Sequence, residues 1–406
     1  MIQYHDALNQ ILSSAEPLPA ETIPADAAVG RVTANGINSP EYLPPFANSA
    51  MDGFAVRAND TEGAERPREF RVKGMIAAGD VVDESFQTAA DETWEIMTGA
   101  PLPAGCDRVI KVEETRRTGD VVTWNRAIAS GENVRHAGED FDIGDRISDG
   151  RTVVLPEHLM AFAALGIRDI SVVRRPRVAV ISTGAELAPD GGHGKIRNSS
   201  APYLMAELNA LGVSPKFIGT VPDEEDTFLA KVEAELRLGV DVIVSTGAVS
   251  MGRFDFVATA LKRLGAEILF HKVAIRPGKP LLFAKIGAAT FFGVPGNPVA
   301  TTVGLRFFVE PYLRALKGLP PELPARATLE FTVKKPAGLR CFYKAETKKL
   351  TLRRTTRALK GQESFRIAPL LTANSWVVLP EEGGEVVGDT EVDVFPLHSW
   401  TDKETI

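Results

Sequence analysis

Cysteine is scarce in this sequence, which has only Cys106 and Cys341 among its 406 residues. Two cysteines so far apart exclude a zinc cluster, and their scarcity fits a reducing compartment. No apolar run approaches the ~18 residues of a membrane-spanning helix. The N-terminal segment lacks the basic start and the long apolar core of a signal peptide. These absences predict a cytoplasmic protein that does not span a membrane.

An excess of positive charge is also missing, because the formal net charge is -7 at pH 7. Without a basic stripe interleaved with aromatic residues, the sequence does not predict nucleic-acid binding. It has neither a Walker A loop nor the G-x-G-x-x-G pattern, so the two common nucleotide-binding fingerprints are absent. The segment "GAVSMG" has one residue too many before Ser250 for the nucleophile elbow of a hydrolase.

The size and the composition of the chain predict several domains. With 44% hydrophobic and 24% charged residues, the chain is typical of soluble globular proteins. Its 406 residues are enough for three or four domains. Residues 40–141 carry short β-prone runs between Gly and Pro, which predicts a small, mostly β domain. The segment "LPEHLMAFAALGI" (155–167) predicts a helix with Pro156 in its first turn.

From residue 177 onward, strands and helices alternate. The apolar runs "RVAVIS", "KFIGTV", "DVIVS" and "ATFFGV" are separated by helical segments, which predicts an open α/β sheet with a largely parallel core. The prolines of "GLPPELPA" mark a linker. Residues 326–398 then return to alternating strands, so a compact β domain is expected at the C-terminal end.

One short segment of this acidic chain concentrates permanent cations. "HKVAIRPGKPLLF" (271–283) holds Lys272, Arg276 and Lys279 and is typical of two short strands joined by a tight turn. Pro277 and Gly278 occupy the central positions of a type II turn, which would hold Arg276 and Lys279 within ~7 Å at Cα. An exposed charged turn would explain this pattern equally well. A pocket for an anion is favoured only if neighbouring segments complete it.

Three loops could complete such a pocket, because each one follows a predicted strand and runs toward a helix. They are "STGAEL" (182–187), "STGAVSMGRFD" (245–255) and "PGNP" (295–298). Ligands of open α/β sheets bind beyond the carboxyl ends of the strands, where backbone N–H groups and hydroxyls can hold phosphate. Taken singly, each loop is also ordinary turn chemistry. The candidate anion-binding residues are Ser182, Thr183, Gly184, Ser245, Thr246, Gly247, Ser250, Pro295, Gly296, Asn297 and Pro298.

Carboxylates stand beside these loops. Glu186 and Asp255 are candidate Mg²⁺ ligands, because Mg²⁺ beside phosphate is held by carboxylates together with substrate oxygens and water. For Asp255 the alternative is a carboxylate that serves the dipole of the following helix. Polar segments of the first half hold Asp52 (in 44–56), Thr98 (in 95–107) and Asp140 with Glu139 (in 131–145). Each of these segments taken singly is typical of a loop.

The motifs occur in an order and spacing that resemble a known family. "NSAMDGFAV", "IMTGAPLPAG", "GENVRHAGEDF", "STGAEL", "IRNSS", "STGAVSMGRFDF", "KVAIRPGKPLLF" and "GVPGNPVA" are similar to those of the MoeA-type molybdopterin molybdenumtransferases, which resemble the E domain of gephyrin. The resemblance extends over nearly the whole chain, including "LTANSWVVLPE". Three positions depart from it, because Ala185, Ala248 and Ala47 stand where the family commonly has Asp, Gly and Asp.

The resemblance implies a multidomain α/β plus β fold in an elongated homodimer. Its α/β domain would be similar to the adenylyltransferase that acts one step earlier, and its C-terminal β domain would be barrel-like. The implied parts are a linker and helical dimerisation domain (25–44 and 142–172), a mostly β domain (45–141), an α/β molybdopterin-binding domain (1–24 and 173–323) and a C-terminal β domain (324–406).

The resemblance also implies a reaction and a set of site residues. Molybdenum from molybdate would enter adenylylated molybdopterin, with Mg²⁺ assistance and release of AMP. Lys272, Arg276 and Lys279 would dock molybdate and phosphate, Glu186 and Asp255 would hold Mg²⁺ or orient the attacking water, and the three loops would cradle phosphate or pterin. Carried over by position, the functional residues are Asp52, Thr98, Asp140, Glu186, Asp223, Asp255, Lys272 and Arg276.

The family's site lies between subunits, so Asp52, Thr98 and Asp140 are expected to reach the cleft from the partner subunit. Molybdopterin adenylyltransferase and the apoproteins of molybdoenzymes, or their chaperones, are the expected further partners. Two alternatives remain open at this stage. One is a non-catalytic dimeric scaffold of the gephyrin E type, and the other is a nucleotide-phosphate transferase with no molybdenum role.

Overall fold

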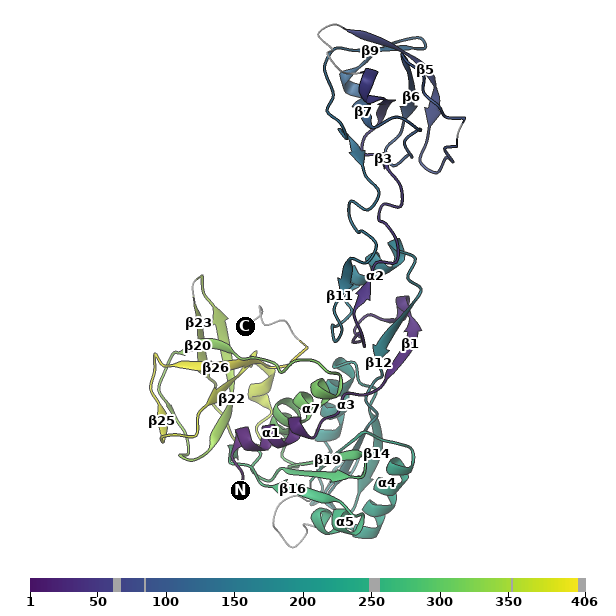
Figure 1. Ribbon diagram of the computed structural model, residues 1–406. Coiled ribbons are helices and arrows are strands. Elements are labelled where there is room, and N and C mark those ends of the chain that lie inside the picture. The colour runs from purple at the N-terminus through teal and green to yellow at the C-terminus, as the bar shows by residue number, and fades with distance from the viewer. Residues whose placement is uncertain (61–66, 84, 248–255, 352, 401–406) are drawn as a thin grey trace. The chain divides into compact units, whose positions relative to one another are not determined.

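The computed structural model describes all of residues 1–406 except 61–66, 84, 248–255, 352 and 401–406. The chain divides into two compact units (Figure 1). One unit combines Met1–Glu21 with Val173–Ile406, and the other is Thr22–Val172. Among the described residues, no helix has both the length and the apolar character needed to cross a bilayer.

The first unit contains the predicted open α/β sheet, with the strand order β14-β13-β15-β19-β18-β16. The first four of these strands are parallel, and β18 and β16 continue the sheet in antiparallel fashion. Their apolar runs are continuous because both faces of the sheet are covered. The strands are β13 (Val178–Thr183), β14 (Lys216–Val221), β15 (Val242–Thr246), β16 (Glu267–His271), β18 (Leu282–Ile286) and β19 (Ala289–Val294).

Helices cover the two faces of this sheet, and alternate strand residues point to opposite faces. Val180 and Val244 pack in one core with α1, α3, α6 and α7, whereas Ile181 and Ile243 pack in another with α4 and α5. A π-helical turn, η4 (Leu305–Val309), joins α6 to α7. The helices are α1 (Tyr4–Ser13), α3 (Ser200–Ala210), α4 (Glu225–Arg237), α5 (Val257–Arg263), α6 (Pro298–Gly304) and α7 (Glu310–Leu316).

The C-terminal part of the same unit is a closed β-barrel, as predicted. Strand β24 pairs with both β26 and β22, so the order β22-β23-β20-β26-β24 returns to its starting strand. A two-stranded ribbon of β21 and β25 and a 3₁₀ turn, η5 (Ala368–Leu371), complete this part. The strands are β20 (Ala325–Leu329), β21 (Val333–Lys334), β22 (Arg340–Lys349), β23 (Arg354–Ala358), β24 (Ser375–Leu379), β25 (Glu385–Val386) and β26 (Glu391–Pro396).

The ends of the cationic segment pair as in the predicted hairpin, since His271 lies opposite Leu282 and the Lys272 N–H donates to the Leu281 carbonyl at 2.9 Å, but the middle of the segment differs from it. Strand β17 (Ile275–Arg276) leaves the α/β sheet and pairs in parallel with β22 of the barrel, with Arg276 opposite Cys341. The antiparallel partners are instead β16 and β18, so residues 272–281 form the connection between them. The turn glycine is where it was expected, because Gly278 has φ +102.

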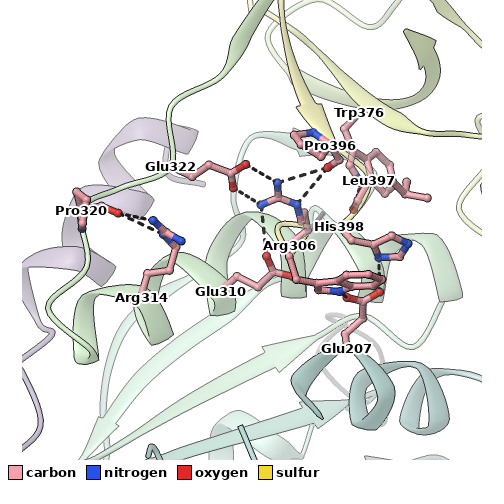
Figure 2. Close-up of polar contacts among 11 residues, drawn as sticks. Glu207, Arg306, Glu310, Arg314, Pro320, Glu322, Trp376, Pro396, Leu397 and His398 are labelled. Atoms are coloured by element: carbon pink, nitrogen blue, oxygen red, sulfur yellow. Dashed lines mark hydrogen bonds and ion pairs between the residues drawn. The ribbon is translucent and has the colours of Figure 1, made fainter. Parts of the chain in front are cut away.

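A buried polar cluster ties the end of the barrel to the helices (Figure 2). The Arg306 guanidinium donates to both carboxylate oxygens of Glu322, at 2.7 and 3.0 Å, and to Glu310 Oε2 at 3.3 Å. After β26, His398 Nδ1 lies 2.5 Å from Glu207 Oε1 of α3. The C-terminal segment is thereby fixed against α3, whose N-terminal end borders the site described below.

The second unit contains the predicted mostly β domain. Its six-stranded sheet has the order β7-β4-β6-β5-β9-β8, and β3 (Asn48–Ser49) pairs with β10 (Val134–Arg135) beside it. Phe70 and Trp124 stack in its core with 3.9 Å between ring centroids. The sheet strands are β4 (Gly53–Val56), β5 (Arg68–Ile76), β6 (Glu92–Ile96), β7 (Arg108–Lys111), β8 (Arg116–Thr118) and β9 (Val121–Trp124).

The rest of this unit contains two short strand pairs, one α-helix and three 3₁₀ turns, η1 (Ala25–Ala27), η2 (Ala58–Asp60) and η3 (Val112–Glu114). The predicted helix is present as α2 (Pro156–Ala164), and His158 Nδ1 accepts the Leu155 N–H at its start, at 3.0 Å. The strand pairs are β1 (Ala20–Pro24) with β12 (Asp169–Val173) and β2 (Ile37–Asn38) with β11 (Arg146–Ser148).

Candidate functional site

A cavity of about 550 Å³ lies at the carboxyl ends of β13, β15 and β19. This is where an open α/β sheet binds ligands, and the described residues of the three predicted loops do converge here. The lining residues are Thr183, Glu186, Leu187, Ile196, Arg197, Asn198, Ser199, Ser200, Thr246, Gly247, Pro280, Pro295, Gly296, Asn297, Pro298 and Phe365.

Hydroxyl groups connect the first two loops below the cavity. Thr183 Oγ1 donates to the Thr246 carbonyl at 3.0 Å, and Thr246 Oγ1 donates to Ser182 Oγ at 3.0 Å. Ser182 and Ser245 are fully buried, and neither lines the cavity. Ser245 Oγ is buried with no hydrogen-bond partner among the described residues. In the repeated Ser-Thr-Gly triplet, the threonine thus faces the cavity and the serine supports the strand ends.

Glycine is required at the end of the second triplet. Gly247 has φ +88, and a Cβ atom there would lie 2.3 Å from the Thr183 carbonyl oxygen. Its N–H donates to the Val294 carbonyl at 3.1 Å, which joins this loop to the third one. Ala248, Ser250 and Asp255, the remaining predicted residues of this loop, lie outside the described residues.

The third loop is held by hydroxyls of two helices. Thr301 Oγ1 of α6 donates to the Pro295 carbonyl at 2.6 Å, and Ser200 Oγ of α3 donates to the Gly296 carbonyl at 3.2 Å. Gly296 and Asn297 remain exposed at the cavity, and α6 begins at Pro298 as predicted. The loop therefore presents its backbone to the cavity on a fixed support.

Two carboxylates belong to the first loop. Glu186 lines the cavity, and its carboxylate oxygens lie 2.6 Å from where a Cβ on Gly184 would be, so glycine leaves them room. Asp223 Oδ2 accepts the Ala185 N–H at 3.3 Å and thereby orients this loop from the next strand end. Ala185 itself brings no carboxylate, although the family commonly has Asp here.

The described residues alone do not form a complete metal cage. In the described part of the chain, no three His, Cys, Asp or Glu side chains gather closely enough to hold a metal ion. Mg²⁺, however, needs only one or two carboxylates when substrate phosphates and water supply its other ligands. Glu186, on the wall of a cavity that also presents hydroxyl and amide groups, fits that kind of site.

The predicted cations do not line the cavity. Of the segment 271–283, Pro280 is the residue in its wall, whereas Arg276 and Lys279 are exposed and Lys272 is half-buried with φ +94. The expected placement of the three side chains is therefore wrong as stated. The reason is the pairing of β17 with the barrel, which directs the chain away from the loops before it returns at Pro280.

Two features of this region were missed by sequence reasoning. The first is an adjoining cavity of about 680 Å³ with apolar walls that include Met205, Phe217 and Pro222. It shares Leu187, Arg197 and Asn198 with the first cavity. The sequence signal for this cavity was the aromatic Phe217 in the predicted strand "KFIGTV", which the structure leaves exposed on edge strand β14. The second feature is Phe365, which comes from the barrel.

The predicted residues of the second unit form two groups. Thr98 donates to Asp52 Oδ1 from its backbone N–H and from Oγ1, both at 2.7 Å. These two bonds hold the pKa of Asp52 below its usual range. Asp140 lines a separate cavity of about 480 Å³ together with Leu43, Pro44, Asn48, Arg135 and Glu139. That these residues serve a partner's cleft remains a prediction.

Comparison with known proteins supports the family resemblance over nearly the whole chain. Residues 2–166 match the family model "MoeA N-terminal region (domain I and II)", and residues 179–315 match "Probable molybdopterin binding domain". The molybdopterin molybdenumtransferase of Synechococcus elongatus is 36% identical, covering 98% of this chain and 100% of that protein. The protein of that name from Bacillus subtilis is 32% identical, covering 93% and 90%. The crystal structure of the molybdopterin biosynthesis MoeA protein from Pyrococcus horikoshii superposes with a TM-score of 0.85 at 28% identity, covering 98% of this chain and 100% of that chain.

Proposed function

The chain belongs to the molybdopterin molybdenumtransferase (MoeA) family, and we propose that it transfers molybdenum from molybdate to adenylylated molybdopterin, releasing AMP. The observation that carries this reaction is the cavity formed by three loops at the carboxyl ends of β13, β15 and β19. Backbone N–H groups and hydroxyls at such a place suit the pyrophosphate of an adenylylated substrate.

The residues of this cavity would bind the phosphates of the substrate through hydrogen bonds. Gly296 and Asn297 of the third loop would donate backbone hydrogen bonds to phosphate oxygens. The hydroxyls of Thr183 and Thr246 and the N–H of Gly247 already donate within the protein, so these residues would hold the floor on which the phosphates rest. Because the backbone of the third loop is fixed by the hydrogen bonds described above, the donors are oriented before the substrate arrives. Such preorganised donors stabilise charge that develops on oxygen as the bond between the two phosphates breaks.

The cationic segment has a different role in this proposal. Lys272, Arg276 and Lys279 do not line the cavity, but Lys279 adjoins Pro280 of its wall, and Arg276 and Lys279 are exposed. Exposed cations at the edge of a cleft raise the local concentration of anions. Both substrates, molybdate and the adenylylated pterin, are anions, so the segment would attract them to an otherwise acidic protein.

Mg²⁺ is the cofactor that this site would hold. Glu186, together with Asp255, would bind it, and the ion would supply charge neutralisation at the phosphate oxygens. Asp223 holds the Ala185 N–H and would keep Glu186 directed at the cavity. The variant Asp255→Asn tests directly whether Asp255 is a Mg²⁺ ligand. Full turnover by that variant would refute this role.

The same proposal includes a homodimer in the cytoplasm. Met160 of helix α2 and Leu155, which caps its start, are apolar side chains that are 76% and 45% exposed, and a second subunit would cover them. Asp52, Thr98 and Asp140 would then complete the partner's cavity. The adenylyltransferase that supplies the substrate and the apoproteins or chaperones that accept the product are the further partners we expect.

The experiment is to measure AMP release from adenylylated molybdopterin with and without molybdate, in the presence of Mg²⁺. The proposal expects release that depends on molybdate. A scaffold of the gephyrin E type would give no turnover, and a nucleotide-phosphate transferase would give turnover that ignores molybdate. Either result would overturn the proposed reaction.

A further inference from the structure

One loop of the C-terminal barrel reaches the cavity of the α/β domain. Phe365 of this loop lines the cavity and is not part of the hydrophobic core of the barrel. The neighbouring Ser364 carbonyl accepts the N–H of Val299, the second residue of α6, at 3.0 Å. The tip of the loop is therefore fixed beside Asn297 and Pro298, on the rim of the cavity.

The base of this loop is fixed by a buried lysine. Lys344 of β22 is fully buried, and its Nζ donates to the carbonyls of Gly361 at 2.7 Å and Arg366 at 3.1 Å, on either side of Phe365. Burial lowers the pKa of Lys344 to about 8. A buried ammonium is costly unless fixed polar groups surround it, so this side chain strongly specifies the path of the loop.

Gln362 adds a second set of restraints. Its Oε1 accepts the Lys344 N–H at 3.0 Å, and its Nε2 donates to the carbonyls of Lys344 and Leu359 at 2.9 and 2.7 Å. The three hydrogen bonds of the Gln362 side chain, the two of Lys344 Nζ and the bond from Val299 thus fix the segment between Leu359 and Arg366. The backbone on both sides of Phe365 is held in one conformation.

The side chain that this framework presents is an exposed aromatic ring. Phe365 is 64% exposed and belongs to none of the described apolar cores, so its burial contributes little to folding. The cavity around it combines hydroxyl, amide and backbone groups with Arg197 and with apolar side chains such as Leu187 and Ile196. A single exposed phenylalanine is ordinary on a protein surface, but this one is anchored at the wall of a polar cavity.

We propose that Phe365 is a stacking platform for a planar heteroaromatic ring of the substrate, and that Lys344 is the residue that positions it. This inference rests on the proposed function, whose substrate carries two such rings, the pterin and the adenine. An aromatic side chain can stack on either ring, because each offers a flat π-face. The polar loops bind the phosphates while Phe365 binds the ring.

Kinetics of three full-length variants test the platform. Phe365→Ala should raise KM for adenylylated molybdopterin about tenfold, the range found when an aromatic stacking partner is removed, with KM for molybdate unchanged. Phe365→Tyr keeps the ring and should stay near the wild type. Phe331→Ala is the matched control, because Phe331 is also a barrel phenylalanine, 67% exposed, but does not line the cavity.

The outcomes separate this inference from the reaction itself. If the wild type is active and Phe365→Ala behaves like Phe331→Ala, the platform is refuted while the proposed function stands. If the wild type releases no AMP in the presence of molybdate, the proposed function fails first. Calorimetric titration of the variants with AMP and with 6-carboxypterin identifies which ring of the substrate stacks on Phe365. If Phe365→Ala binds one probe more weakly than Phe331→Ala does, the platform binds that ring. If the two variants bind each probe equally well, the platform is refuted.

The positioning role has its own test. Lys344→Met should raise KM for adenylylated molybdopterin more than it lowers kcat, and Lys344→Arg, which keeps donors for the two carbonyls, should recover part of the loss. If Lys344 acts through Phe365, the double variant should be no worse than Phe365→Ala alone. Additive losses would contradict the positioning role. Should Lys344→Met fail to fold, Phe365→Ala still decides the platform.

Discussion

The Asp52 carboxylate accepts two hydrogen bonds from a single residue, Thr98, whose backbone N–H and Oγ1 both lie 2.7 Å from Oδ1. The two residues are 46 positions apart in the sequence, and β4 and β6 bring their segments together. The hydrogen bonds favour the charged form of the carboxyl group. An exposed aspartate is thereby kept ionised and fixed in direction, as a residue that completes a partner's site would need to be.

The first prediction follows from this pair. Thr98→Val removes the hydroxyl donor and keeps the backbone donor, so the pKa of Asp52 should rise toward its ordinary value, ~3.9, without reaching it. Because the folded-state pKa is depressed, Asp52 favours the folded state above the unfolded pKa, and this contribution is lost as the pH falls through the folded-state pKa. An NMR titration of the carboxyl carbon would measure the shift. An unchanged pKa would mean that the hydroxyl contributes nothing.

The second prediction concerns the floor of the cavity. Gly247→Ala places a methyl group against the Thr183 carbonyl in a backbone conformation that favours glycine. We expect a loss of about 1–3 kcal/mol in the free energy of unfolding together with reduced turnover. Gly287→Ala is the control, because Gly287 also has positive φ but a Cβ there would meet nothing within 4 Å. Equal losses in the two variants would argue against a close approach at Gly247.

The third prediction concerns the buried cluster of Figure 2. Burial raises the pKa of Glu310 to about 7, although Arg306 lies 3.3 Å away, because that guanidinium is already paired with Glu322. An acid whose pKa is raised by folding binds its proton more tightly in the folded state. The free energy of unfolding should therefore fall as the pH rises from the unfolded value, ~4.3, toward 7. Denaturant titrations at several pH values would measure this slope.

Glu310→Gln should flatten that pH dependence, because the neutral amide does not titrate. Glu233→Gln is the matched control, since Glu233 pairs with Arg237 on the exposed surface of α4. It should leave the slope unchanged. A slope that is the same in wild type and Glu310→Gln would show that folding does not raise the pKa of Glu310.

The fourth prediction tests whether the site is shared between subunits. Asp52→Asn and Glu186→Gln should each be nearly inactive, yet co-expression should restore about a quarter of the wild-type activity, since half the dimers are mixed and each mixed dimer has one intact site of two. Glu186→Gln co-expressed with Asp223→Asn is the control, because both residues serve the same loop of the α/β domain: Glu186 belongs to it and Asp223 accepts the N–H of its Ala185. No recovery with the first pair would exclude a shared site.

The sequence predicts the α/β fold and the converging loops well, because both follow from local patterns. A strand buried on both faces is a continuous apolar run, as in Val178–Thr183, and the residues after it must lie at one edge of the sheet. The serine of each triplet was wrongly predicted to face the cavity, because a local pattern does not show which of two neighbouring hydroxyl residues points inward. Ser182 and Thr183 are alike in sequence, but the alternation along the strand buries one and turns the other to the cavity.

The misplaced cations and the missed ring have a different origin. The path of residues 272–281 depends on pairing with Arg340 and Cys341, more than 60 positions later in the chain, and no local pattern encodes that. Phe365 reaches the cavity only because Lys344 and Val299 hold its loop. In the sequence, it is one aromatic residue in a polar loop. Contacts between domains thus decide which side chains a local motif receives as neighbours.

The central claim is that the three loops at the carboxyl ends of β13, β15 and β19 hold adenylylated molybdopterin for molybdenum insertion. It is tested most directly by AMP release from that substrate, with and without molybdate, by wild type and Glu186→Gln. The account predicts release that requires molybdate and falls by about 10²-fold or more in the variant. Release independent of molybdate, or full turnover by Glu186→Gln, would contradict it.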